Sequence, residues 1–190
     1  MSAYVFLGPS LPLATASAVL PATYLPPIQQ GDILRLLERE PDIIGIVDGY
    51  FEVVPAVWHK EILLALEAGV RVYGAASMGA IRAAELHSFG MTGIGSVFEW
   101  LRDGVICRDD EVAIIHAPAE LGYAPLSVAL VDIRDACDAA TREGIVAAPE
   151  AKRLIAAASD LPFPERSYDA VAQAIAGDIG PSDIRRWLAF

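Results

Sequence analysis

Short apolar runs that alternate with amphipathic segments constrain the fold of this chain more than any other feature. The run DIIGIVDG at residues 42–49 is almost continuously apolar and ends in Asp-Gly. A strand that is buried on both faces has this pattern, and such strands are typical of parallel sheets. Because parallel strands are joined by crossovers, the segments that follow these runs must pass over the sheet, usually as helices. The pattern therefore predicts an α/β fold.

The same alternation recurs along the first two thirds of the sequence. Segments with strand character lie at 3–8, 42–49, 70–75 and 110–117, and segments with helical character lie at 31–40, 55–69 and 78–89. From Leu126 onwards the pattern is helical, over 126–143, 149–159, 167–176 and 182–188. We expect a three-layer α/β architecture, in which helices flank both faces of a parallel sheet of four or five strands, followed by a helical C-terminal tail.

The length of the chain sets the expected domain organisation. Its 190 residues suffice for one domain with a sizeable core and a small addition. We predict an α/β core domain over residues 1–145 and a helical C-terminal extension over 146–190, packed on the core or next to it. The segment SDLPFPERS at 159–167 is the candidate linker ahead of the last helices.

Composition and charge exclude several classes of function. The formal net charge of −11 disfavours a nucleic-acid partner, because phosphate binding needs a basic face. Charged residues, proline or glycine interrupt every apolar run, so no membrane span is expected, and the N-terminus lacks the basic region of a signal peptide. The two cysteines, Cys107 and Cys137, give neither a disulfide framework nor metal-ligand spacing. We expect a cytoplasmic protein without a metal or a cofactor.

Small and polar residues follow three of the predicted strands. These strand ends are Gly8-Pro9-Ser10, the segment 48–52 that begins Asp48-Gly49-Tyr50, and Ser77-Met78-Gly79. A single Asp-Gly is only a turn signal, but parallel strands end at one edge of a sheet, where α/β proteins bind ligands. We therefore expect the three segments to gather at this edge and to line a binding site. The glycine-rich GMTGIGS at 90–96 lacks an adjoining lysine and is interpreted as a turn.

Ser77 lies in GAASMGA, at the junction of a strand and a helix, and two interpretations stay open. In one, its side chain caps the helix by accepting a hydrogen bond from a first-turn N–H. In the other, the junction presents the hydroxyl for chemistry, where N–H groups near Gly79 hold a developing oxyanion. The GxSxG motif itself is absent, because Ala75 occupies the place of the first glycine.

A catalytic serine needs a base, and the chain has three histidines. We rank His59, early in a helix, above His116, at the end of a predicted strand, and His116 above His87, late in a helix. Each of them is also explained by a structural role. Asp48 and Glu52 are suited to orienting a base or binding a cation.

Several blocks of the sequence resemble the TfuA-like protein family, over roughly residues 4–135. They are VFLGPSL at 5–11, YLPPIQQGDI at 24–33, IGIVDGYFEVVPAVWHKEIL at 44–63, GAASMGAIRAAEL at 74–86, FGMTGIG at 89–95 and DDEVAIIHA at 109–117. The resemblance implies a role beside YcaO enzymes in thioamidation, where sulfur replaces a backbone amide oxygen. It further implies one of two activities: cleavage of a thiocarboxylated, ThiS-like sulfur carrier to supply sulfide, or non-catalytic activation or recruitment of YcaO by binding.

The strand-end residues and the implied reaction can be combined. Sulfide release from a carrier thiocarboxylate is acyl-transfer chemistry, which needs a nucleophile or activated water, a base and oxyanion donors. We predict Ser77, His59, Asp48 and His116 as catalytic residues. The predicted substrate-binding residues are Gly8, Ser10, Gly49, Tyr50, Glu52, Lys60, Met78, Gly79 and Arg82. Lys60 or Arg82 would meet the anionic thiocarboxylate. The expected partners are a YcaO enzyme and a ThiS-like sulfur carrier, and a homo-oligomer remains open.

Overall fold

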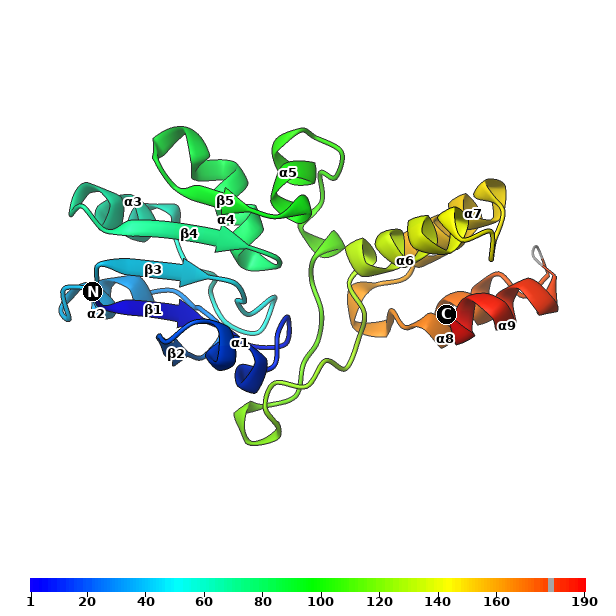
Figure 1. Cartoon of the computed structure of the whole chain (residues 1–190), viewed down its shortest axis with the longest axis horizontal. Helices are drawn as coiled ribbons and strands as arrows, with labels where there is room; N and C mark the ends of the chain where they lie inside the picture. The colour runs from blue at the N-terminus through cyan, green and yellow to red at the C-terminus, as the bar shows by residue number, and fades with distance from the viewer. Residues whose placement is uncertain (178–179) are drawn as a thin grey trace. The chain divides into compact units, whose positions relative to one another are not determined.

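The computed structural model describes residues 1–177 and 180–190, which form two compact units (Figure 1). The first unit comprises Met1–Asp109 and His116–Ala124, and the second comprises Asp110–Ile115 and Pro125–Phe190. Helix α6 (Leu130–Arg142) thus belongs with the later helices, whereas the predicted core domain over residues 1–145 included it.

The first unit is built on a parallel sheet of five strands in the order β2-β1-β3-β4-β5. The strands are β1 (Ala3–Phe6), β2 (Thr23–Leu25), β3 (Ile43–Ile46), β4 (Arg71–Ala75) and β5 (Thr92–Ile94). All four neighbouring pairs are parallel. The helices of this unit are α1 (Leu13–Val19), α2 (Asp32–Leu37), α3 (His59–Glu67), α4 (Met78–Leu86) and α5 (Ser96–Arg102). The predicted α/β fold, a parallel sheet flanked by helices, is confirmed.

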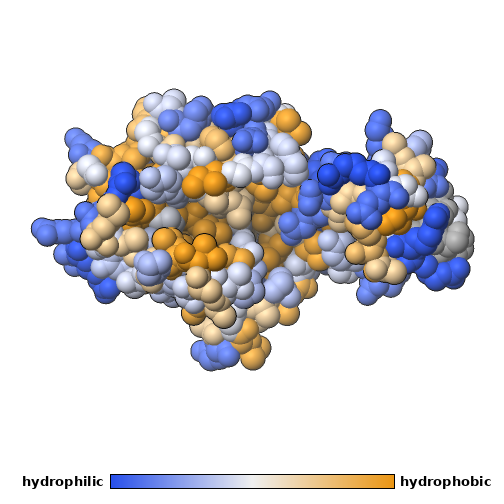
Figure 2. Space-filling view, viewed as in Figure 1, coloured by the Kyte–Doolittle hydropathy of each residue, from blue (hydrophilic) through white to orange (hydrophobic). Residues whose placement is uncertain are grey.

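The core of this unit lies on one face of the sheet, under α2, α3 and α4. Ile44, Ile46 and Val72 point to this face and are fully buried with residues of these helices. The alternate strand residues, such as Val5 and Tyr73, face the other side and are only partly buried. Figure 1 views the sheet from this second side, and Figure 2, in the same view, shows that hydrophobic and hydrophilic residues are mixed there. The first helix, α1, belongs to this second face by the right-handed crossover rule, and Ala16 is its buried residue.

Two sequence expectations fail in this part of the chain. The segment 90–96 is not only a turn, because it contains the edge strand β5. The segment 110–117 is not a strand: a 3-10 turn, η2 (Asp109–Glu111), opens it, and the rest has no partner strand. Val112, Ala113 and Ala117 are buried and Ile114 and Ile115 partly buried, but the backbone N–H of Ile115 donates to the side chain of Ser127. The apolar pattern of this segment therefore reflects burial and not pairing with a neighbouring strand.

The second unit is helical, as predicted for the end of the chain. After α6 come α7 (Ala148–Asp160), α8 (Tyr168–Ala174) and α9 (Pro181–Ala189), around a core that includes Ile133, Cys137 and Leu154. The predicted linker at 159–167 lies inside this unit, because the fully buried Arg166 donates hydrogen bonds to the carbonyls of Ala158 and Leu161. No helix in the described part of the chain has the length and apolar character needed to cross a bilayer.

Candidate functional site

The strand order places a recognised kind of ligand site at the carboxyl ends of β1 and β3. The chain leaves β1 towards β2 on one side and leaves β3 towards β4 on the other, so the connections diverge between these two neighbouring strands. In doubly wound parallel sheets, ligands bind in the crevice at such a point. Gly8 and Ser10 follow β1, and Asp48 follows β3, so the predicted gathering of strand ends at this edge is observed.

Asp48 organises this edge of the sheet. Its side chain is fully buried, and one carboxylate oxygen, Oδ2, accepts hydrogen bonds from the backbone N–H of Gly8 at 2.8 Å and of Ser10 at 3.2 Å. The other oxygen accepts a hydrogen bond from the Ser10 hydroxyl at 2.6 Å. Burial raises the pKa of Asp48 above its usual value, although the bonds from Ser10 and Gly8 and the nearby His116 oppose this effect.

A second group of side chains surrounds His116. The loop His116–Ala124 returns to the sheet unit, and the His116 ring packs between two tyrosine rings, with centroids 5.4 Å from Tyr50 and 5.6 Å from Tyr123. Its Nδ1 lies 2.9 Å from the carbonyl of Ala117. Burial, together with the neighbouring Tyr123 hydroxyl, raises the pKa of Tyr50, so its phenol stays protonated and can donate a hydrogen bond.

Ser77 lies at a sharp junction between β4 and α4. The preceding residue, Ala76, has a φ of 57°, a conformation that is uncommon for residues other than glycine and recurs at functional sites. Ser77 is 9% exposed, and its side chain makes no capping hydrogen bond to α4. The capping interpretation of this serine is therefore wrong. The interpretation as a presented hydroxyl remains a prediction.

Two glycines bring α4 unusually close to the sheet. A Cβ atom on Gly79 would lie 1.8 Å from the carbonyl oxygen of Ile46, and one on Gly74 would lie 2.1 Å from the carbonyl oxygen of Gly79. The N–H of Gly79 donates to the carbonyl of Val47 at 3.2 Å. Packing therefore explains Gly79, and its N–H is already engaged rather than free for an oxyanion. Gly49 packs less tightly, on the side chain of the buried Met78, where an added Cβ would lie 2.7 Å from Cγ.

The remaining predicted residues lie on the helices and the loop after β3. His59 Nε2 lies 2.8 Å from Glu85 Oε2, and Arg82 pairs with the same oxygen at 2.7 Å. Arg82 also donates to the carbonyl of Val57. The structure thus joins His59 to Arg82 and Glu85 on the surface of α3 and α4, and it is His116 whose charge acts on Asp48. Lys60 and Glu52 are exposed.

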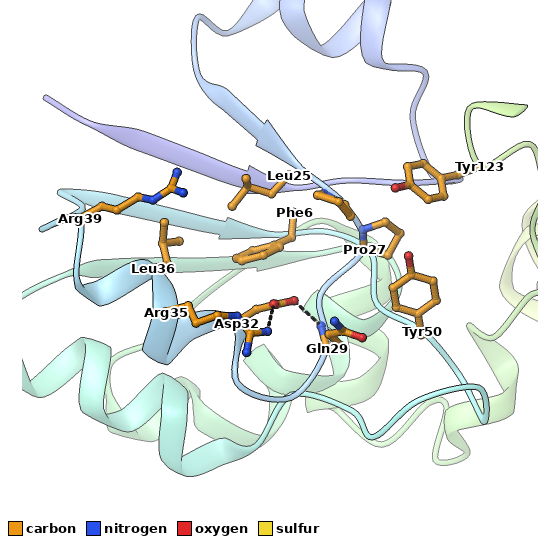
Figure 3. A pocket seen from close by; sticks show the side chains of 11 residues that line it. Phe6, Leu25, Pro27, Gln29, Asp32, Arg35, Leu36, Arg39, Tyr50 and Tyr123 are labelled. Atoms are coloured by element: carbon orange, nitrogen blue, oxygen red, sulfur yellow. Dashed lines mark hydrogen bonds and ion pairs between the residues drawn. The ribbon is translucent and has the colours of Figure 1, made fainter. Parts of the chain in front are cut away.

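A pocket of about 380 Å³ adjoins the tyrosine pair (Figure 3). It is lined by Phe6, Leu25, Pro26, Pro27, Gln29, Asp32, Arg35, Leu36, Arg39, Tyr50 and Tyr123. Of these, only Tyr50 was among the predicted site residues. Phe6 ends β1 but carries no polar group that marks a site. Most of the others were missed because they lie in or after β2, which is too short to give a strand pattern, and Tyr123 was missed because the loop 116–124 has no periodicity. In the described residues, no group of three or more histidine, cysteine, aspartate or glutamate side chains is placed to hold a metal ion.

Comparison with known proteins supplies the family. The curated proteins contain no match to this chain. The sequence model of TfuA-like proteins matches residues 48–167, which include Asp48, Ser77 and His116 and amount to more than half of the sequence. This chain therefore belongs to the TfuA-like family, which supports a role related to thioamidation.

Proposed function

We propose that this chain hydrolyses the thiocarboxylate of a ThiS-like sulfur carrier in the cytoplasm and so supplies sulfide to a YcaO enzyme. The observation that supports this most is the grouping of Asp48, His116 and Tyr50 where β1 and β3 end, in the same sheet unit as the Ser77 junction. It gives a buried acid beside a partly buried base and hydrogen-bond donor, at the edge of the sheet where α/β proteins bind substrates.

The reaction balances without a cofactor. A thiocarboxylate and water give a carboxylate and hydrogen sulfide, and the carbon–sulfur bond breaks while a carbon–oxygen bond forms. Addition of the nucleophile puts negative charge on the former carbonyl oxygen, so a nearby hydrogen-bond donor accelerates the step. Departure of sulfide is helped by a proton on the sulfur.

Each side chain has a role that fits its surroundings. His116 takes the proton of the nucleophile, which is the Ser77 hydroxyl or a water molecule, and gives it to the leaving sulfur. If Ser77 is the nucleophile, water then attacks the acyl-serine ester, His116 takes the proton of this water and returns it to the serine oxygen, and the carboxylate is released. Asp48, fixed by hydrogen bonds from Gly8 and Ser10, interacts electrostatically with His116, and this interaction opposes the effect of burial on the pKa of Asp48. Tyr50, which stays protonated, donates a hydrogen bond to the oxyanion. In this scheme His116 replaces His59 as the base, because His59 is paired with Glu85.

The test is sulfide release from a purified thiocarboxylated carrier, with neither YcaO nor ATP present. We expect release by the wild type and a loss of ~100-fold or more in His116→Phe and Ser77→Ala. His59→Ala is the matched histidine control and should keep the wild-type rate. If Ser77→Ala alone keeps the rate, water is the nucleophile. A folded His116→Phe variant with the wild-type rate would contradict the assigned base, and no release by the wild type would contradict the hydrolase.

A non-catalytic role is the second candidate, and one observation favours it. Val53 and Trp58, in the loop between β3 and α3, are 72% and 55% exposed, as expected of a protein-binding surface. In this role the chain binds YcaO and activates it. The chain would then stimulate YcaO supplied with free sulfide, and Trp58→Ser would remove the stimulation, whereas His116→Phe would not.

A further inference from the structure

The pocket beside the tyrosine pair is an elongated trough with chemically different ends. In Figure 3, Tyr50 and Tyr123 lie at one end, Arg39 lies at the other, and Phe6 and Leu25 lie between them. We call this pocket the arginine trough. Its volume of about 380 Å³ falls at the lower end of the range for ligand sites, roughly 300–1,000 Å³.

The end of the trough opposite the tyrosines carries positive charge. Arg35 Nη2 lies 2.5 Å from Asp32 Oδ1, so these two charges largely cancel each other. The side chain of Arg39, just beyond the end of α2, has neither a hydrogen bond nor an ion pair with any of the residues described, although its backbone N–H donates to the carbonyl of Leu36. An arginine left uncompensated at a pocket is notable in a chain of net charge −11. Its guanidinium is suited to a carboxylate.

The trough is continuous with the candidate site. Tyr50 lines the trough and also packs against His116, which acts on Asp48. A chain whose end reaches Asp48 and His116 would therefore pass the tyrosine pair and continue between Phe6 and Leu25 towards Arg39. The walls offer apolar contact, and the far end offers a cation.

We propose that the arginine trough binds the C-terminal tail of the sulfur carrier in an extended conformation, with apolar side chains against Phe6 and Leu25 and an acidic side chain at Arg39. This rests on the proposed function, because it takes the carrier as the substrate. Arg39 makes the trough selective, because a tail with a basic residue at the position that meets Arg39 cannot form this ion pair.

The test uses two fluorescein-labelled peptides that end in Gly-Gly with a free carboxylate. They are identical except for one position upstream of an apolar pair, which is Glu in one and Lys in the other. Fluorescence anisotropy should show that Arg39→Glu weakens binding of the Glu peptide ~10-fold and strengthens binding of the Lys peptide. Arg71→Glu, at the start of β4, makes the same change of net charge away from the trough and should leave both affinities within about twofold.

The outcomes separate this proposal from the hydrolase. Equal binding of both peptides to the wild type and to Arg39→Glu would overturn the trough, as would no binding of either, even if sulfide is released from the carrier. Charge-dependent binding without sulfide release would support the trough and contradict only the hydrolase. Arg39 is exposed, so Arg39→Glu should fold normally, which circular dichroism checks.

Discussion

Asp48 is the residue whose loss should most affect the candidate site, and the cost can be worked from its contacts. In Asp48→Ala the N–H groups of Gly8 and Ser10 and the Ser10 hydroxyl lose their acceptor. An unsatisfied buried polar group costs roughly 1–3 kcal/mol. Because Ser10 is partly exposed and can find water, we expect the free energy of unfolding to fall by about 2–4 kcal/mol.

Asp48→Asn is the matched control. Its carbonyl oxygen can still accept from both N–H groups, and its amide can donate to the Ser10 hydroxyl, so the loss should be about 1 kcal/mol or less. Urea denaturation measures both values, and hydrogen exchange of a peptide that covers Gly8 and Ser10 reports on the local bonds. The reasoning is refuted if Asp48→Ala loses less than ~0.5 kcal/mol, or if exchange at Gly8 is unchanged.

The wild type and Asp48→Asn should also differ in how their stability depends on pH. Burial raises the pKa of Asp48 above 3.8, so the folded protein holds this proton more tightly than the unfolded chain. The contribution of Asp48 to the free energy of unfolding therefore increases as the pH falls from above the raised pKa to 3.8. This contribution is lost as the pH rises through the raised pKa. The wild type should gain stability relative to Asp48→Asn over this window. An unchanged difference would contradict the direction of the shift.

Two further predictions concern packing and thiol reactivity. Gly79→Ala should strongly destabilise the sheet unit in thermal denaturation, because the new Cβ would meet the carbonyl of Ile46. The control Gly45→Ala, whose new Cβ has its nearest contact at 3.4 Å, should be neutral or stabilising by up to about 1 kcal/mol. Equal effects of the two substitutions would contradict the close approach of α4 to the sheet. Cys107 is exposed, while burial raises the pKa of Cys137 to about 11, so a thiol reagent at pH 8 should label one cysteine of the folded chain and two after unfolding.

The architecture and the meeting of strand ends could be predicted because both depend on local signals. A continuous apolar run such as 42–49 indicates a buried parallel strand, and parallel strands bring their ends to one edge whatever their order. Asp48, Gly8 and Ser10 were therefore placed correctly as neighbours. The strand order was not predicted, because it depends on packing between distant segments.

The errors arise where burial and regular structure do not coincide. The segment 110–117 is rich in apolar residues that are buried or partly buried, yet it is not a strand. Conversely, β2 and β5 are strands of three residues each, too short for a pattern. His59 was ranked first among the bases because of its position near a helix start. The sequence gives no sign that Glu85, on the next helix, pairs with it, or that a loop brings His116 to Asp48.

The loop His116–Ala124 is therefore the part of the sheet unit on which the site depends most. It supplies His116 and Tyr123, and a hydrogen bond of 2.8 Å between the N–H of Ala117 and the carbonyl of Ala124 closes it. Ala117 is its only buried residue, whereas the sheet beneath holds most of the core. Segments with few buried contacts open at a smaller free-energy cost than core strands. We therefore expect this loop to open without unfolding of the sheet. Opening would admit the proposed carrier tail to Asp48, and closing would restore the ring contacts around His116.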